Sequence, residues 1–394
     1  YSMILSWAAN YLGFSFKKSW GADSNGFFHN SFLKLTDSPF DFGGMVWPIL
    51  IGISLVWIVN WFICYKGIKG GIEKANKILL PMLIVIMIII AIRSVTLEGA
   101  ITGLNTLFTP DWSMVMQPKV WVAAYGQVFF SLSLAMGIMM TYSSYLPKKT
   151  DINNSAFMTA FANCGFEFLS AIAVFGILGF MATAQGVPMS EVVSSGVGLA
   201  FVVFPAVFSE MGAVGTVLGV LFFLCLLFAG VTSSVSLTEA VSAPFRDKFG
   251  WKREKVVTGI CIIGFLVSTL YATGAGLYLL DIIDNFINNY GIVVVGLLEV
   301  ILIGWIIKPK TIREHTNEIS YFKIGSWWDI IIKFLTPAIL IYMLIQSFIG
   351  EVKSPYGGYP LLALFLYGWS VIGIGIIGAL IITKRPWKEK KIEE

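Results

Sequence analysis

Charge is scarce in this sequence of 394 residues, in which Asp, Glu, Lys and Arg together make up 13% and apolar residues 57%. The mean hydropathy of +0.80 lies above the usual range of soluble globular proteins. The few charges gather in short runs between apolar stretches of roughly 20 residues, the length that a helix needs to cross about 30 Å of hydrocarbon. We therefore expect a polytopic helical protein in a lipid bilayer, with no nucleic-acid partner.

Cysteine and histidine are also few, with four and two residues respectively. Each cysteine stands alone inside an apolar stretch, and the absence of a CxxC pair argues against a disulfide framework or a metal site. The cysteines are Cys64, Cys164, Cys225 and Cys261. Because His29 and His315 fall in polar connecting segments, no histidine cluster for catalysis or metal binding is visible. We expect neither an enzyme nor an organic cofactor.

The apolar stretches predict the membrane segments of one transmembrane domain, residues 1–394. The first stretch, residues 1–16, is only about a long half of a spanning helix, and the sequence does not begin with Met, so we expect an upstream part to be missing. Connectors at 21–44, 95–118 and 184–201 are expected outside the cell, and the last two are long enough for short surface helices. The predicted spans are 45–65, 76–94, 119–145, 155–183, 202–243, 254–274, 282–307, 328–349 and 360–383.

Basic residues give the expected orientation in the cell membrane. Most of them lie in alternate connectors and in the tail 384–394, and the opposite connectors hold few. Because cytoplasmic loops carry an excess of Lys and Arg, we expect a multi-pass plasma-membrane protein whose tail is cytoplasmic.

The span 119–145 is a poor helix in its middle, where Ser131, Ser133 and Gly137 cluster. Serine competes with the backbone for hydrogen bonds, and glycine weakens a helix interior by about 1 kcal/mol. Two half-helices around residues 132–137 would expose dipole ends near the bilayer midplane and could form an ion and solute site. A continuous helix that uses small residues for packing is the equal alternative.

Four segments together carry a family resemblance: GQVFFSLSLAMGIMMTYSSYL (126–146), GLAFVVFPAVFS (198–209), FAGVTSSVSL (228–237) and LYLLDIIDNFINNYG (277–291). In this order they resemble the neurotransmitter:sodium symporter family, and its bacterial amino-acid transporters in particular. The resemblance implies an all-α fold of two inverted five-helix repeats and two accessory helices, with one discontinuous helix. The chain would provide helices three to twelve. Since the first two would be lacking, we expect the chain expressed alone to show no sodium-coupled uptake.

The resemblance implies two sodium sites in the full-length protein. Ser131 and Asn163 resemble ligands of the first, and their hydroxyl and amide oxygens are neutral donors suited to a dehydrated monovalent cation. The carbonyl of Ala229 and the hydroxyls of Thr232 and Ser233 resemble half of the second; three- and four-residue spacing places them on one helix face. For both sets, packing between helices is the alternative interpretation.

The resemblance also implies a solute pocket and a fixed charge. Glu167, four residues after Asn163, matches the position where chloride-independent members carry a carboxylate in place of the anion. Glu299 resembles a glutamate that supports the broken helix from behind, and we expect Glu239 near Tyr145 on the cytoplasmic path. Adaptable Met136 would suit a bulky apolar guest, although plain core lining is the alternative. The substrate residues implied are Tyr1, Phe130, Ser133, Met136, Ser233 and Leu237.

Charged residues at the two mouths would form gates. Asp284 resembles the outer-gate aspartate, with Gln127 beneath it, and Asp247 resembles the inner-gate aspartate, with Tyr145 nearby. Gly71 and Pro81 resemble a helix start that unwinds to admit water, because proline removes a backbone donor and glycine weakens the first turns. Without the family motifs, these two residues would indicate only the beginning of a helix.

The predicted function is sodium-coupled symport of an amino acid, hydrophobic or aromatic, by alternating access around a midplane site. A channel or another membrane solute-binding protein is the alternative, although no filter sequence or repeated pore segment is present. A membrane enzyme is disfavoured because the embedded glutamates are too scattered. The exact substrate, the ion stoichiometry and the oligomeric state do not follow from the sequence.

Overall fold

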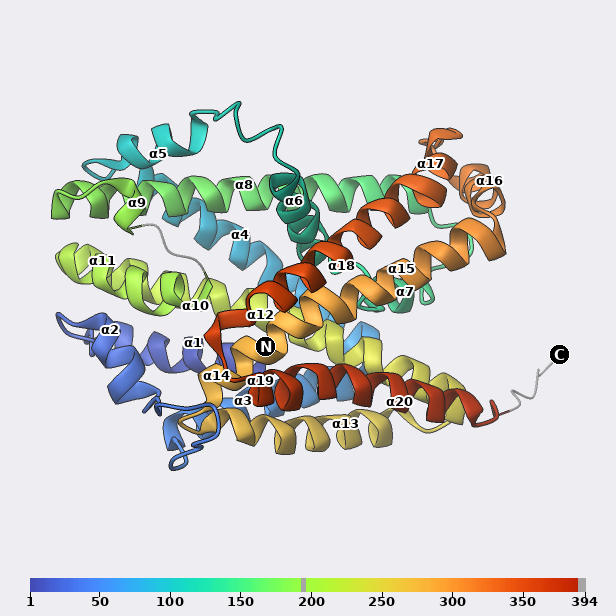
Figure 1. Cartoon of the computed structure of the whole chain (residues 1–394), viewed down its shortest axis with the longest axis horizontal. Helices are drawn as coiled ribbons and strands as arrows, with labels where there is room; N and C mark the ends of the chain where they lie inside the picture. The colour runs from blue at the N-terminus through green and yellow to red at the C-terminus, as the bar shows by residue number, and fades with distance from the viewer. Residues whose placement is uncertain (193–195, 389–394) are drawn as a thin grey trace. The chain divides into compact units, whose positions relative to one another are not determined.

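The computed structural model describes residues 1–192 and 196–388. Over these residues the chain is helical, apart from loops and one isolated bridge between Met45 and Thr273. Figure 1 labels the helices along the chain. The chain divides into two compact units: unit 1 comprises residues 1–110, 165–246 and 251–277, and unit 2 comprises residues 111–164, 247–250 and 278–394.

Three α-helices have residues in both units, and the others belong to one. The shared helices are α8 (Ile152–Gln185), α12 (Gly212–Phe249) and α14 (Gly276–Phe286). Unit 1 holds α1 (Ser2–Ser15), α2 (Ser24–Gly26), α3 (Trp47–Tyr65), α4 (Glu73–Val95), α5 (Ala100–Phe108), α9 (Met189–Val192), α10 (Gly196–Gly198), α11 (Phe204–Glu210) and α13 (Arg253–Ser268). Unit 2 holds α6 (Pro118–Ser131), α7 (Ile138–Ser143), α15 (Val293–Ile301), α16 (Pro309–Ile319), α17 (Trp327–Ile330), α18 (Thr336–Lys353), α19 (Leu361–Ala363) and α20 (Ser370–Lys384).

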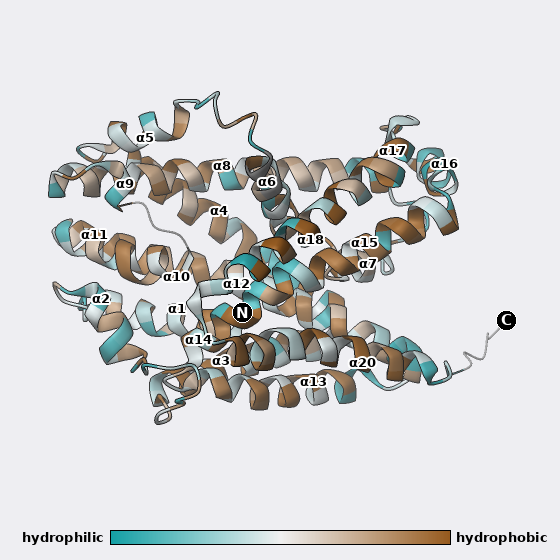
Figure 2. Ribbon diagram, viewed as in Figure 1, coloured by the Kyte–Doolittle hydropathy of each residue, from teal (hydrophilic) through white to brown (hydrophobic). Residues whose placement is uncertain are grey.

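Short π-helical turns, called wide turns below, and short 3₁₀-helical turns, called tight turns, extend several of these elements. Wide turns are Phe27–Phe32, Ile68–Ile72, Leu199–Val203, Ile287–Ile292, Leu302–Ile307, Ile331–Leu335 and Leu364–Trp369; tight ones are Thr269–Ala272 and Tyr356–Gly358. With these turns included, eight continuous helices among the described residues are long and apolar enough to cross a membrane. They correspond to eight of the nine predicted spans, and Figure 2 shows apolar residues along helices such as α13 and α20, whereas α16 is hydrophilic.

The remaining predicted span, residues 119–145, is broken. Of the two interpretations of its sequence, a broken or a continuous helix, the structure has the first. Helix α6 ends at Ser131 and α7 begins at Ile138, and Figure 1 draws them as separate helices. Between them Ser133, Ala135 and Gly137 have φ of 53°, 59° and 71°. Three left-handed residues within five positions cannot continue a right-handed helix. The discontinuous helix is therefore confirmed.

One predicted span is wrong in its extent, because residues 202–243 do not form a single segment. An apolar helix of Gly196–Glu210 ends before Met211, and α12 follows as a separate helix. Gly212 has φ of +59°, and a Cβ on Gly215 would lie 1.9 Å from the carbonyl oxygen of Phe208. The turn thus depends on two glycines within an apolar sequence, where hydropathy gives no signal of a boundary.

Unit 1 is built around a cluster of aromatic side chains. Tyr11 of α1 contacts Phe201 and Phe223 at ring centroid distances of 5.2 Å, and Trp7 meets Phe28 edge-on at 5.4 Å. All five side chains are at most 1% exposed. Large rings in edge-to-face contact bury much apolar area and fix their relative orientation. This cluster holds α1 against the helices that follow it in unit 1.

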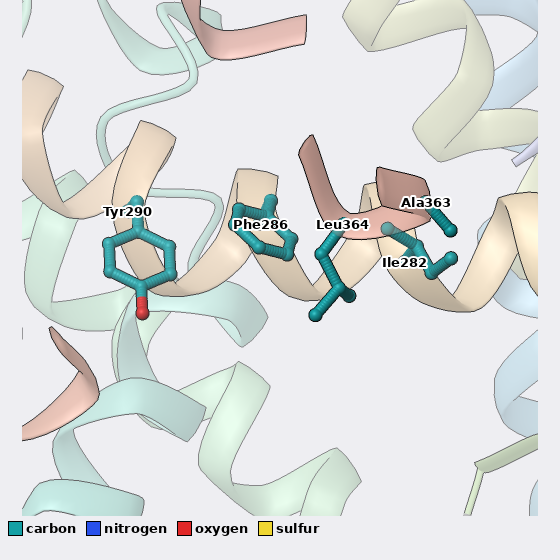
Figure 3. Close-up of a cluster of buried hydrophobic side chains, with 5 residues drawn as sticks. All are labelled: Ile282, Phe286, Tyr290, Ala363 and Leu364. Carbon is teal, nitrogen blue, oxygen red and sulfur yellow. The ribbon is translucent and has the colours of Figure 1, made fainter. Parts of the chain in front are cut away.

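Unit 2 has its own core, in which α14 and the turn after it pack against the segment that begins at α19. Figure 3 shows Ile282, Phe286, Tyr290, Ala363 and Leu364 together, and all of them are at most 7% exposed. A Cβ on Gly368 would lie 2.5 Å from the ring of Phe286, so only glycine lets the backbone come this close.

Candidate functional site

The break of the α6/α7 helix brings one predicted pair of sodium ligands together. Nδ2 of Asn163, on α8, donates a hydrogen bond to Oγ of Ser131 at 3.2 Å, and both side chains are half-buried. Ser131 is the last residue of α6, so its hydroxyl lies where the helix stops. A half-turn of the Asn163 amide would present its oxygen instead of its nitrogen, and two neutral oxygens would then face the same point. Whether sodium binds between them stays a prediction.

The second predicted set lies entirely in unit 1, on α12. Oγ1 of Thr232 donates to the carbonyl oxygen of Ala229 at 2.8 Å, so two predicted ligand oxygens are neighbours. Ser233 follows on the same helix and is half-buried. A Cβ on Gly230 would lie 2.4 Å from Cδ2 of Leu5, which shows how closely α1 approaches this turn of α12. The contact from threonine to a carbonyl three residues earlier is common in helices and does not by itself indicate an ion site.

Glu167 lies on α8, one turn after Asn163 on the same helix face, and is half-buried. It is a carboxylate within a segment long and apolar enough to cross a membrane. Such residues are costly in lipid surroundings and are associated with function. Its predicted role as a substitute for chloride is a matter for the experiments proposed below.

The predicted outer-gate residues of unit 2 share one pocket. Gln127 and Phe130 of α6 and Asp284 of α14 line a cavity of about 300 Å³. Asn288 and Asn289, from the wide turn after α14, also line it. The structure therefore brings together the predicted outer-gate residues Gln127 and Asp284 and the predicted substrate residue Phe130, from segments more than 150 positions apart. The cavity offers a carboxylate and three amides beside an aromatic ring.

Glu299 lies beside the break, as its predicted supporting role requires. It lines a second cavity of unit 2, of about 460 Å³, together with Ser133, Ala135 and Gly137 of the broken segment. Its Oε1 atom is buried and has no hydrogen-bond partner within the part of the chain that the structure describes. A free acceptor beside an interrupted backbone can receive a hydrogen bond from an amide or a water there. The role itself stays a prediction.

The remaining substrate residues divide between the units. Tyr1, Ser233 and Leu237 belong to unit 1, and Ser133 and Met136 belong to unit 2 together with Phe130. Tyr1 is 47% exposed and Phe130 45% exposed, and the other four side chains are half-buried. The common pocket for these residues stays a prediction.

The residues of the predicted cytoplasmic gate and of the predicted unwinding segment have the following positions in the structure, and their roles stay predictions. Asp247 is exposed near the end of α12, and Tyr145 lies in the loop between α7 and α8. Gly71 lies in a wide helical turn, and Pro81 lies inside α4, which continues through it. A Cβ on Gly71 would lie 2.0 Å from the carbonyl oxygen of Ile63, so close packing is one reason for glycine here.

Sequence reasoning missed a buried charge cluster in unit 1. Glu239 is 0% exposed, and its carboxylate accepts hydrogen bonds from the guanidinium groups of Arg246 and Arg253. Nε of Arg253 also donates to the carbonyl oxygen of Cys64 at 2.8 Å. A buried carboxylate with two cations keeps its charge compensated. The seven-residue spacing from Glu239 to Arg246, which returns to the same helix face, could have indicated one partner; nothing local indicates Arg253.

Comparison with known proteins shows the family of the chain. A model of the sodium:neurotransmitter symporter family matches residues 17–385. An uncharacterized sodium-dependent transporter of Methanocaldococcus jannaschii is 38% identical over 384 residues, which cover 98% of this chain and 78% of the relative. The sodium- and chloride-dependent glycine transporter 1 of Xenopus laevis is 29% identical over 354 residues, 88% of this chain and 54% of the relative. The sodium- and chloride-dependent taurine transporter of Canis lupus familiaris is 28% identical over 355 residues, 88% of this chain and 57% of the relative.

The chain thus spans just over half the length of the two animal relatives and about three quarters of the archaeal one. Within the chain, the family match includes the broken α6/α7 helix, the α8 residues Asn163 and Glu167, and the Ala229–Ser233 turn of α12. On this evidence, the chain belongs to the sodium:neurotransmitter symporter family.

Proposed function

We propose that the protein containing this chain couples the movement of sodium down its gradient to the uptake of an amino acid. The observation that supports this most strongly is the broken helix whose last α6 residue, Ser131, contacts Asn163 of a neighbouring span. Irregular backbone at membrane depth is tolerated where it lines a cavity or a binding site. Because the family is one of symporters, the enzyme alternative is set aside.

The proposed sodium ligands are neutral oxygens at two places. Ser131 and Asn163 would serve one ion, and Ala229, Thr232 and Ser233 the other. In each contact the polar atoms lie within 3.2 Å of each other, so a cation can bind there once the Thr232 hydroxyl hydrogen turns away and the Asn163 amide turns its oxygen toward Ser131. In the proposed cycle, sodium orders these groups and the unwound segment 132–137 together, and the fixed charge of Glu167 takes the place of a bound anion.

The proposed solute is an amino acid with a hydrophobic or aromatic side chain. Two of the relatives are transporters of glycine and of taurine, which supports a small zwitterion as the solute class. Phe130 and Met136 offer apolar surface beside Ser133, and methionine adapts its shape to bulky guests. Tyr1 would donate to the solute carboxylate.

The direct test is uptake by liposomes that contain the purified natural protein. A sodium gradient should drive accumulation of a hydrophobic amino acid above its external concentration, and an equal potassium gradient should not. A channel would only equilibrate the solute, so the absence of accumulation under a sodium gradient would favour that alternative. Ser131→Ala and Asn163→Ala should reduce sodium-driven uptake, whereas Ser143→Ala and Asn154→Ala, which remove the same groups outside the proposed site, should not.

A further inference from the structure

A dense group of hydrogen bonds lies where α8 begins, and no role has been assigned to it above. The side-chain amide of Asn317, near the end of α16, makes hydrogen bonds to both the N–H and the C=O of Ile324. Its Oδ1 accepts from the amide of Ile324 at 2.9 Å, and its Nδ2 donates to the carbonyl of Ile324 at 2.8 Å. This pairing folds residues 320–324, the loop after α16, back toward their own helix.

The start of α8 is held by the same loop. Nδ2 of Asn153 donates to Oδ1 of Asn317 at 3.0 Å and to the carbonyl of Phe322 at 3.1 Å. The backbone amide of Asn153 donates to Oγ of Ser320 at 3.2 Å. Asn153 is 6% exposed, and Ser320 is 4% exposed, so these bonds are largely shielded from water.

Asp151 completes the group from the residue just before α8. Its Oδ1 accepts from the amide of Asn154 at 3.0 Å, and its Oδ2 accepts from the amide of Tyr321 at 2.8 Å. The first amides of a helix have no partner within the helix and must find acceptors elsewhere. Here they find them in Asp151 and, through Ser320, in a loop almost 170 residues further along the chain. The loop therefore caps α8.

The helix capped in this way, α8, is long and carries the proposed sodium ligand Asn163. Helix α8 runs without interruption from Ile152 to Gln185 (Figure 1). Asn163 lies about 15 Å along it from Asn153, at about 1.5 Å per residue. A shift or fraying of the first turns of α8 is therefore carried toward the contact between Asn163 and Ser131.

We propose that Asn153 and Asn317 are positioning residues that latch the start of α8 to the loop 320–324 and thereby hold Asn163 in register with Ser131. This inference rests on the proposed function only in naming the Asn163–Ser131 contact as a sodium site. The latch is a mechanical arrangement of unit 2, so it can be examined without any transport measurement. It would act on sodium binding and not on the apolar contacts of the solute.

Amide hydrogen exchange of the full protein in detergent tests the latch itself. Asn153→Ala and Asn317→Ala should each increase exchange in residues 152–163 and 320–325 at least tenfold. Asn154→Ala is the matched control, because it removes a side-chain amide one position later, where the side chain is exposed, but keeps the backbone bond to Asp151. If exchange rises only in 320–325, the loop does not hold α8 and the proposal is overturned.

A sodium titration of the same variants tests the consequence. The sodium concentration for half-maximal uptake should rise about threefold to tenfold in Asn153→Ala and Asn317→Ala, and the KM for solute at saturating sodium should stay unchanged. A general loss of folded protein would lower the maximal rate of uptake, and would not raise the half-maximal sodium concentration while the KM for solute stays unchanged. If the parent shows no sodium response, the proposed function fails, and the exchange experiment still decides the latch.

A reversible cross-link provides the rescue. In the pair Asn153→Cys with Ser320→Cys, oxidation should restore both slow exchange and sodium affinity, and a reductant should abolish the restoration. Each single cysteine variant controls for the exposed native Cys164. A cross-linked protein that retains fast exchange in 152–163 would contradict the latch.

Discussion

At the scale of single residues, the proposed function depends on neutral oxygens and one embedded carboxylate. The hydroxyl of Thr232 touches the carbonyl oxygen of Ala229, and Asn163 touches Ser131. The first contact lies within one helix and the second joins two helices, and each is also compatible with ordinary packing of membrane helices. Substitution of individual side chains distinguishes the two interpretations at these positions, because the loss of a ligand oxygen weakens sodium binding, whereas the loss of a packing contact acts mainly on the stability of the helices.

Thr232→Ala and Ser233→Ala should each weaken sodium-dependent solute binding. A lost ligand oxygen must be replaced by a weaker partner, and the cost should be about 1–3 kcal/mol, which corresponds to a fold-change in sodium affinity of about 5 to 150. Sodium titration of solute binding measures this change. Thr216→Ala, more than four turns earlier on α12, serves as the control; unchanged sodium affinity in the Thr232/Ser233 double variant would remove both residues from the site.

Transport should not require chloride, because Glu167 supplies a fixed negative charge. Glu167→Ser should make uptake respond to chloride, since the vacated position then favours an anion near the proposed cations. Uptake measured with chloride or with gluconate as the counter-ion checks this, and Glu191→Ser, an exposed residue of α9, is the control. Chloride-dependent uptake by the unaltered protein would refute the role of Glu167.

At the scale of elements, two local geometries decide how helices begin and end. The α6/α7 break relies on residues with a left-handed backbone conformation, which cannot continue a right-handed α-helix. The beginning of α8 relies on acceptors supplied by Asp151 and Ser320. Both features are elements of unit 2, and both can be weakened without touching a proposed ligand.

Gly137→Ala should lower the free energy of unfolding by about 1 kcal/mol, because its φ of +71° disfavours a residue with a Cβ although no atom lies within 4 Å of that position. Gly165→Ala is a sharp control: its Cβ would also meet nothing within 4 Å, but it lies in the regular helix α8. At position 165, alanine should raise the free energy of unfolding by up to about 1 kcal/mol. Denaturant titration in detergent measures both; equal effects of the two substitutions would argue against a conformational cost at the break.

Acid should loosen the start of α8. Hydrogen bonds from the backbone amides of Tyr321 and Asn154 hold the pKa of Asp151 below its usual value of 3.8. A carboxyl whose pKa is lower in the folded state contributes stability above its unfolded pKa, and this contribution disappears as the pH falls through the folded pKa. The protection of the Tyr321 amide should therefore fall as the pH drops below 3.8. Asp151→Asn should remove this pH dependence, and Asp37→Asn, an exposed control, should leave it unchanged.

At the scale of the whole molecule, the chain consists of two compact units, each with its own core and its own share of the proposed site. Unit 1 contains the Ala229–Ser233 turn, and unit 2 contains Ser131, Asn163 and the pocket of Asp284. Binding of sodium to the folded protein, but not to the unfolded chain, would stabilise the whole by mass action.

Sodium should therefore raise the thermal stability of the natural protein that contains this chain. At a concentration about 100 times the dissociation constant, one site contributes about 2.7 kcal/mol. The unfolding temperature in sodium chloride should exceed that in potassium chloride of the same ionic strength, and the difference should shrink in the Thr232/Ser233 double variant. An identical rise with potassium would mean that the effect is ionic strength and not site binding.

The sequence by itself determined the membrane class and eight of the nine spans in outline, and it left a break at residues 132–137 and a continuous helix as equal alternatives, which the structure decided in favour of the break. These features follow from properties that act locally: hydropathy over about 20 residues, and the weak helix preference of serine and glycine. The family motifs added the candidate ligands, and the role of Ser131 and Asn163, which are in contact, stays a prediction. Local chemistry is readable because its cause lies within a few residues.

Only the tertiary structure decided how distant segments meet. The division of 202–243 at Met211 depends on Gly215 facing Phe208, and the burial of Glu239 depends on Arg253 arriving from another helix. The capping of Asn153 by Ser320 joins residues 167 positions apart. No periodicity in the sequence encodes such pairs, because hydrogen bonds between distant segments are set by how helices pack and not by the propensity of either segment alone.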